Sequence, residues 1–204
     1  YISTVVVIVF SIIGVYMIKV SGSLIEDMPK GKDFFKDIVF FENEFGGIMP
    51  LEIIIDTKRK KGVMKLSTLK RMDKLVEIID EIPELSPTVS VLNIVKYSKQ
   101  AYYNGNPKYY QLPTSQEQNF ILSYTKNSDT NSDLLSNFVD STGQYARITT
   151  FMKDIGTDKM ERIEERLQAR IDKVLPAKNY NVTLTGKSLV FLKTWQPAEY
   201  EFTS

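Results

Sequence analysis

Few residues in this 204-residue chain are of the types that catalyse reactions. The chain contains no histidine and no cysteine, which excludes a Ser-His-Asp triad, thiolate chemistry and every zinc site that needs either residue. The acidic pairs Asp80-Glu81 and Glu164-Glu165 lie beside Lys and Arg on expected helix faces, a pattern typical of solvated surface. We therefore expect a protein that is not an enzyme and that uses no cofactor and no metal.

Two segments resemble ligand-binding loops but lack a required residue. Gly186-Lys187-Ser188 follows an expected strand, like the end of a phosphate-binding loop, but Asn181 stands where that motif needs its first glycine. Residues 129–133 have the acidic spacing that opens a calcium loop, but Leu134 replaces the turn glycine. We therefore expect an ordinary strand-ending turn at Gly186 and a polar loop at 129–133.

Tyrosines are the remaining side chains that could contact a ligand, because each joins an apolar ring to a polar hydroxyl. Five of them are concentrated in one segment: Tyr97, Tyr102, Tyr103, Tyr109 and Tyr110. They are suited to an amphiphilic ligand or a partly wet interface. The alternative is that they only pack this segment onto the rest of the domain.

The overall composition is that of an ordinary globular domain, with 43% hydrophobic residues, 25% charged residues and a net charge of +1. This near-neutral charge favours no nucleic-acid partner. The basic run Lys58-Arg59-Lys60-Lys61 is interpreted as a solvated loop. A phosphate or lipid-headgroup site is its alternative interpretation.

The N-terminal segment is the most hydrophobic part of the chain. Residues 2–18 carry no charge and would be apolar on every face of a helix about 25 Å long, close to the thickness of a bilayer. We expect a transmembrane helix over residues 1–20, with a cleaved signal peptide or a buried core helix as the alternatives.

A helix, a two-glycine turn and a strand follow this segment. Asp33 to about Phe45 has apolar residues at helical spacing. Gly46 and Gly47 can adopt the positive φ angles that end a helix. Pro50 favours extended backbone at the residue before it and opens an apolar, β-rich strand.

The rest of the chain predicts an α+β domain. Strands are expected at about 51–57, 88–92, 146–152 and 180–184, and long helices capped by Ser67 and Thr157 fall between them. The order β-α-β, insert, β-α-β indicates a ferredoxin-like, split-βαβ domain. The predicted parts are a transmembrane helix at 1–20, a linker and lead-in helix at 21–50, a domain at 51–193 with a helical insert at about 93–145, and a tail of uncertain origin at 194–204.

Four short motifs recur in an order that resembles the large extracytoplasmic loop of resistance-nodulation-division (RND) transporters, especially the MMPL-like and Patched-like lipid exporters. They are Ser23-Leu24-Ile25-Glu26-Asp27-Met28-Pro29, Phe45-Gly46-Gly47, Pro50-Leu51-Glu52-Ile53 and Leu184-Thr185-Gly186-Lys187-Ser188-Leu189-Val190-Phe191-Leu192. The resemblance covers about residues 5–193.

This resemblance implies a porter domain of a proton-driven exporter of lipids or other hydrophobic molecules in the bacterial inner membrane. Residues after about 20 would be extracytoplasmic, and the proton-relay acids would belong to membrane helices outside this chain. The implied partners are the hydrophobic substrate, the membrane, and the remaining membrane helices and second porter domain of the same transporter. The five tyrosines would line the substrate path. The alternative function is a membrane-anchored extracytoplasmic sensor or ligand-binding module.

Overall fold

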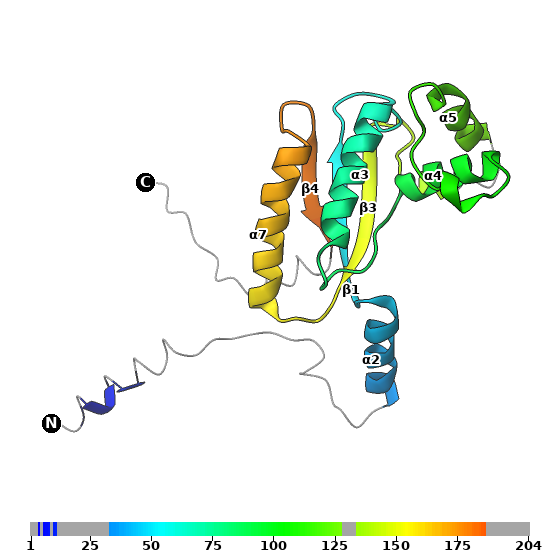
Figure 1. The fold of residues 1–204 in the computed structure, drawn as a ribbon. Helices are drawn as coiled ribbons and strands as arrows, with labels where there is room; N and C mark the ends of the chain where they lie inside the picture. Colours follow the sequence, from blue (N-terminus) through cyan, green and yellow to red (C-terminus); the bar gives the residue numbers. More distant parts are fainter. Residues whose placement is uncertain (1–3, 5, 9, 12–32, 128–133, 187–204) are drawn as a thin grey trace.

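The computed structural model describes residues 4, 6–8, 10–11, 33–127 and 134–186 (Figure 1). They form the predicted α+β fold, in which helices accompany a four-stranded antiparallel sheet. The strands are β1 (Met49–Asp56), β2 (Val89–Ser90), β3 (Tyr145–Met152) and β4 (Asn181–Thr185), and they lie in the order β2-β3-β1-β4. β1 and β3 are therefore the central strands.

One face of the sheet carries the core. Inward-facing residues alternate along β1, where Leu51, Ile53 and Ile55 are buried, and Ile53 lies opposite Ile148 of β3 and Leu184 of β4. The helices α3 (Leu66–Asp80) and α7 (Thr157–Val174) pack side by side over this face (Figure 1). Their apolar stripes supply the other half of the core, which contains Leu69, Met72, Leu75, Ile79, Met160, Ile163, Leu167 and Ile171.

The opposite face of the sheet is more polar and is half-exposed. Glu52 of β1 and Arg147 of β3 form an ion pair there, with 3.7 Å between their charged groups. Ile54 lies between Glu52 and Asp56 on the same face, in a strand whose residues alternate between buried and half-buried. The sheet therefore has one apolar face under helices and one amphipathic face.

Glycines allow the start of β1 to lie close to the ends of β3 and β4. Gly46, Gly47 and Gly186 have φ angles of +75°, +155° and +125°, so the predicted positive-φ turn at Gly46-Gly47 is confirmed. A Cβ atom on Gly47 would lie 2.6 Å from the carbonyl group of Met152, and one on Gly186 would collide with the carbonyl oxygen of Pro50. Larger residues at these two positions would push the strands apart.

The predicted helical insert is present between β2 and β3. It contains α4 (Val91–Tyr102), the short 3₁₀ helix η1 (Pro107–Tyr109) and α5 (Gln118–Asn127). In Figure 1 these helices lie beside the edge of the sheet rather than over α3 and α7.

The prediction for the second strand was largely wrong, because β2 has only two residues and Val91 already begins α4. Ser90 is the reason. Its hydroxyl accepts a hydrogen bond from the Leu92 N–H at 3.2 Å, while its own N–H donates to Asn93 Oδ1 at 2.9 Å. This capping box starts a helix despite the β-branched residues around it.

The predicted helix caps were also wrong. Lys65 and Gly156 are the N-cap residues of α3 and α7, and neither makes a side-chain capping bond. Leu66 is buried and joins the helix, so α3 begins one residue before Ser67. Gly156, at φ +77°, turns the chain so that Thr157 is already helical.

The lead-in helix has the predicted bounds, α2 (Asp33–Phe45), and none of its residues is buried. Among the residues that the structure describes, no helix is long and apolar enough to cross a membrane. The predicted transmembrane helix is therefore not supported, and most of 1–20 lies outside the described residues. The whole linker before α2 at 21–32, the end of the predicted domain at 187–193 and the tail at 194–204 also lie outside them.

Candidate functional site

The structure places the five predicted tyrosines in two groups on the helical insert. Tyr97 and Tyr110 meet edge to face, with 4.7 Å between ring centroids. Tyr103 stacks on Tyr109 at 4.2 Å, and Tyr102 contacts Tyr103 at 5.4 Å. Tyr97, Tyr102 and Tyr110 are exposed, so part of each ring is accessible for a contact.

Phe120 and Tyr124 of α5 extend the second group. Their ring centroids lie 5.1 Å and 5.9 Å from that of Tyr102, and both side chains are exposed. Together with Tyr102 they form an aromatic surface across α4 and α5. An exposed group of aromatic rings on a protein surface marks a candidate contact site.

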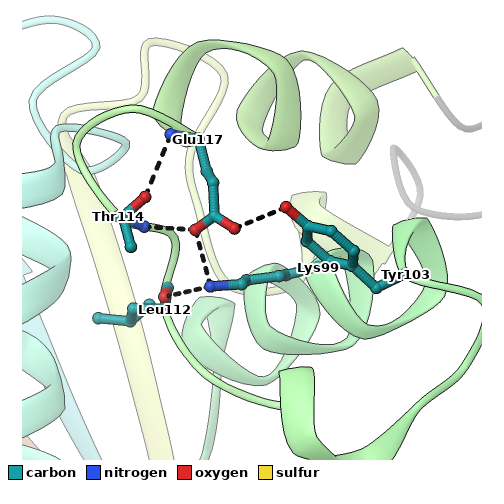
Figure 2. Close-up of polar contacts among 5 residues, drawn as sticks. All are labelled: Lys99, Tyr103, Leu112, Thr114 and Glu117. Atoms are coloured by element: carbon teal, nitrogen blue, oxygen red, sulfur yellow. Dashed lines mark hydrogen bonds and ion pairs between the residues drawn. The ribbon is translucent and has the colours of Figure 1, made fainter.

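A part-buried ion pair that the sequence reasoning missed joins α4 to the segment before α5 (Figure 2). Lys99 is only 2% exposed, and its Nζ donates to Glu117 Oε2 at 2.7 Å and to the Leu112 carbonyl at 3.3 Å. Glu117 also accepts from the Tyr103 hydroxyl at 2.8 Å and from the Thr114 N–H at 2.8 Å.

These contacts give both carboxylate oxygens of Glu117 a hydrogen-bond partner. The hydrogen bond from Lys99 is the main reason that the pKa of Glu117 falls to about 2, and the bond from the Thr114 N–H lowers it further. The Tyr103 pKa is raised, chiefly because its hydroxyl donates to Glu117. The network therefore fixes Tyr103 in place.

The sequence held one signal for this network. Thr114-Ser115-Gln116-Glu117 matches a capping box, and the structure shows both of its bonds, since the Glu117 N–H donates to Thr114 Oγ1 at 3.3 Å. No local pattern indicated that Lys99 would be the partner of this carboxylate.

A second candidate is an apolar cavity of about 470 Å³ at the end of the domain where β1 begins. Its lining is mostly aromatic and aliphatic and contains one charged side chain: Phe34, Asp37, Ile38, Phe41, Phe45, Gly47, Ile48 and Phe151. Phe34, Phe41 and Phe45 are more than half exposed on α2. Apolar lining with few polar groups is typical of sites for hydrophobic ligands.

The cavity is held open between α2 and the ends of β1 and β3. The Asp154 N–H donates to Glu42 Oε1 at 2.7 Å, which ties α2 to the segment after β3. The Ile48 N–H donates to the Met152 carbonyl at 3.2 Å. Phe41 and Phe45 stack with their centroids 4.6 Å apart and form one wall.

The segment with calcium-loop spacing cannot be compared with the structure, whereas Asp140 after it can. Residues 129–133 lie outside the described residues, and Asp140 closes the turn before β3 by accepting bonds from the N–H groups of Thr142, Gln144 and Tyr145. Burial alone would raise the pKa of Asp140, but these bonds and that of the Thr142 hydroxyl hold it below its ordinary value. Within 33–127 and 134–186, no three metal-ligating side chains gather.

Comparison with known proteins assigns the chain to no group: no protein-family model matches it, and no curated protein shows significant similarity to it.

Proposed function

We propose that this chain is the extracytoplasmic, ferredoxin-like porter domain of an RND-type exporter of lipids or other hydrophobic molecules. In this role it binds an apolar substrate and passes it on by domain movement, without covalent chemistry. The observation that carries the proposal is the apolar cavity bordered by exposed phenylalanines of α2. The uncharged segment 2–18 precedes α2 in the sequence. The cavity bordered by α2 therefore belongs to the first part of the domain that follows this segment along the chain.

The strand arrangement agrees with this function. In the order β2-β3-β1-β4, β3 separates β1 from β2, which is the split-βαβ arrangement of ferredoxin-like domains. Gly186 packs against the backbone of Pro50 and Leu51, so the end of β4 lies beside the start of β1. A domain with adjacent entry and exit can be inserted between two membrane helices, as the proposed architecture requires.

The insert tyrosines are proposed to contact neighbouring porter structure along the substrate path. Tyr97, Tyr102 and Tyr110 are exposed, and an aromatic ring with a polar tip suits a partly wet interface. The Tyr103 hydroxyl instead donates a hydrogen bond to Glu117, so we assign Tyr103 a structural role next to the exposed rings.

Binding of a fluorescent apolar probe such as N-phenylnaphthylamine to the full chain in neutral detergent tests the proposed cavity. Phe41 lines the cavity, whereas Phe40 on the same helix is equally exposed and is not a lining residue. We expect Phe41→Ser to weaken probe binding by about tenfold, because burying an aromatic ring contributes about 1.5–3 kcal/mol. Phe40→Ser should leave the affinity within about twofold of the parent.

Equal weakening by both substitutions would show that the probe binds α2 or the micelle nonspecifically and would contradict the cavity site. A membrane-anchored sensor could use the same cavity. The reading frame on either side of this chain distinguishes the two functions. Further membrane helices there indicate an exporter, and an adjoining signalling domain indicates a sensor.

A further inference from the structure

A cavity of about 390 Å³ at the other end of the domain is surrounded by basic side chains. It lies where β1 ends and β4 begins, away from α2 (Figure 1). Five cations and no carboxylate are among its lining residues: Lys58, Arg59, Lys65, Arg71 and Lys178. The chain as a whole is almost neutral, so this is a local concentration of positive charge.

Two of these cations have a structural role. Lys58 Nζ donates to the Ala177 carbonyl at 2.6 Å, and an Arg71 guanidinium nitrogen donates to the Val174 carbonyl at 2.8 Å. Both bonds satisfy carbonyls at or just after the C-terminal end of α7, where cations are favoured. Within the described part of the chain, no carboxylate pairs with the other three, Arg59, Lys65 and Lys178.

Buried hydroxyl groups line the same cavity. Thr68 is 3% exposed and Tyr180 is 8% exposed, and their hydroxyl oxygens lie 3.4 Å apart. One hydrogen bond between them uses only one of their two protons. Among the interactions of the described residues, neither hydroxyl has another partner, so one donor remains for a ligand in the cavity.

The N-terminus of α3 also faces this space. Its cap residue, Lys65, makes no side-chain capping bond, and the first turn contains no acidic residue. Uncapped N–H groups and the helix dipole favour an anion at this position. Positive charges, a spare buried hydroxyl proton and an uncapped helix therefore converge from two segments that are distant in the sequence, 57–71 and 178–180.

We propose that this cavity binds an anionic phosphate group, either of a free phosphorylated molecule or of a lipid headgroup. This site lies apart from the apolar cavity and does not depend on the proposed export function. Arg59 and Lys65 would pair with the phosphate oxygens, and the Thr68–Tyr180 hydroxyl pair would donate to the same group. The basic run Lys58-Arg59-Lys60-Lys61 would then supply part of the site, in agreement with the alternative interpretation of this run.

Calorimetric titration of the full chain in neutral detergent, at constant ionic strength, tests the proposal with two water-soluble probes. Inorganic pyrophosphate represents free phosphate, and glycerophosphoglycerol represents the headgroup of phosphatidylglycerol. We expect at least one probe to bind saturably with a Kd of about 1 mM or tighter. Arg59→Gln with Lys65→Gln should weaken that binding by about tenfold or more, and Thr68→Val by about fivefold.

The matched control is Lys70→Gln with Lys74→Gln, which removes the same charge from exposed positions of α3 outside the cavity. The control should keep the parent affinity, and melting curves would show that each variant is folded. Saturable binding of glycerophosphoglycerol, which is a monoanion, would indicate a lipid headgroup, and binding of the more highly charged pyrophosphate alone would indicate a free phosphate ligand. The proposal is overturned if neither probe binds, if the cavity variants bind like the parent, or if the control loses as much affinity as the cavity pair.

Discussion

At the scale of single residues, Glu117 accepts hydrogen bonds from Lys99, Tyr103 and Thr114 and so connects three parts of the insert. We expect Glu117→Gln to lower the free energy of unfolding by about 3 kcal/mol, because Lys99 would stay buried without its anionic partner. Denaturant unfolding measures this change. Glu165→Gln on the exposed face of α7 is the control and should change stability by less than about 0.5 kcal/mol.

The same residue determines an acid dependence of stability. Its pKa is about 2 in the folded chain, below the ordinary value of 4.5, so the unfolded chain binds a proton first as the pH falls. The stabilisation is complete above about pH 4.5 and is lost as the pH falls toward 2. Glu117→Gln should therefore flatten the stability profile in this range. Parallel profiles for the two proteins would show that Glu117 is not the group responsible.

At the scale of elements, the packing of α4 against α5 gives the tyrosines two different roles: some stabilise the insert, and others are exposed on its surface. Tyr103 donates to Glu117 and stacks on Tyr109, whereas the Tyr102 side chain is 47% exposed. We expect Tyr103→Ser to lower stability by about 2 kcal/mol and Tyr102→Ser by less than about 1 kcal/mol.

Thermal unfolding compares the two substitutions, and Tyr103→Phe separates the lost hydrogen bond from the lost ring. Equal destabilisation by both serine variants would mean that the exposed ring of Tyr102 also supports the insert. If Tyr103→Ser lowers stability and Tyr102→Ser does not, then Tyr102→Ser is the variant with which to test the proposed interface in a complete transporter.

At the scale of the whole molecule, the buried core belongs to one continuous region. Every residue of the core cluster in the described part of the chain lies between Met49 and Tyr180. A protein lacking residues 1–32 should therefore fold alone and unfold in one cooperative transition, because α2 and the sheet are retained. Circular dichroism during heating measures this. Recovery of only aggregated or molten protein would show that the removed segment is needed for folding.

The sequence by itself predicted the α+β class, the bounds of α2 and the positions of the long helices and of three strands. These features follow from the periods of the backbone, since helix and strand place apolar residues on one face at 3.6 and 2 residues. The turn at Gly46 and Gly47 was equally local, because it depends on which residues tolerate positive φ. Features that depend on residues close together in the sequence can be predicted without knowledge of the rest of the fold.

The short β2 is also a local feature, because Ser90 and Asn93 form the capping box that begins α4 where β-branched residues favoured a strand. Only the tertiary structure decided the contents of the candidate sites. Lys99 of α4 forms an ion pair with Glu117, which lies beyond an intervening loop in the sequence. Each cavity likewise collects side chains from segments far apart in the chain, such as α2 with Phe151 of β3, or the loop after β1 with Tyr180. These groupings arise from the way the sheet and helices pack together. Contacts between segments far apart in the chain produce no periodic pattern in the sequence from which they could be predicted.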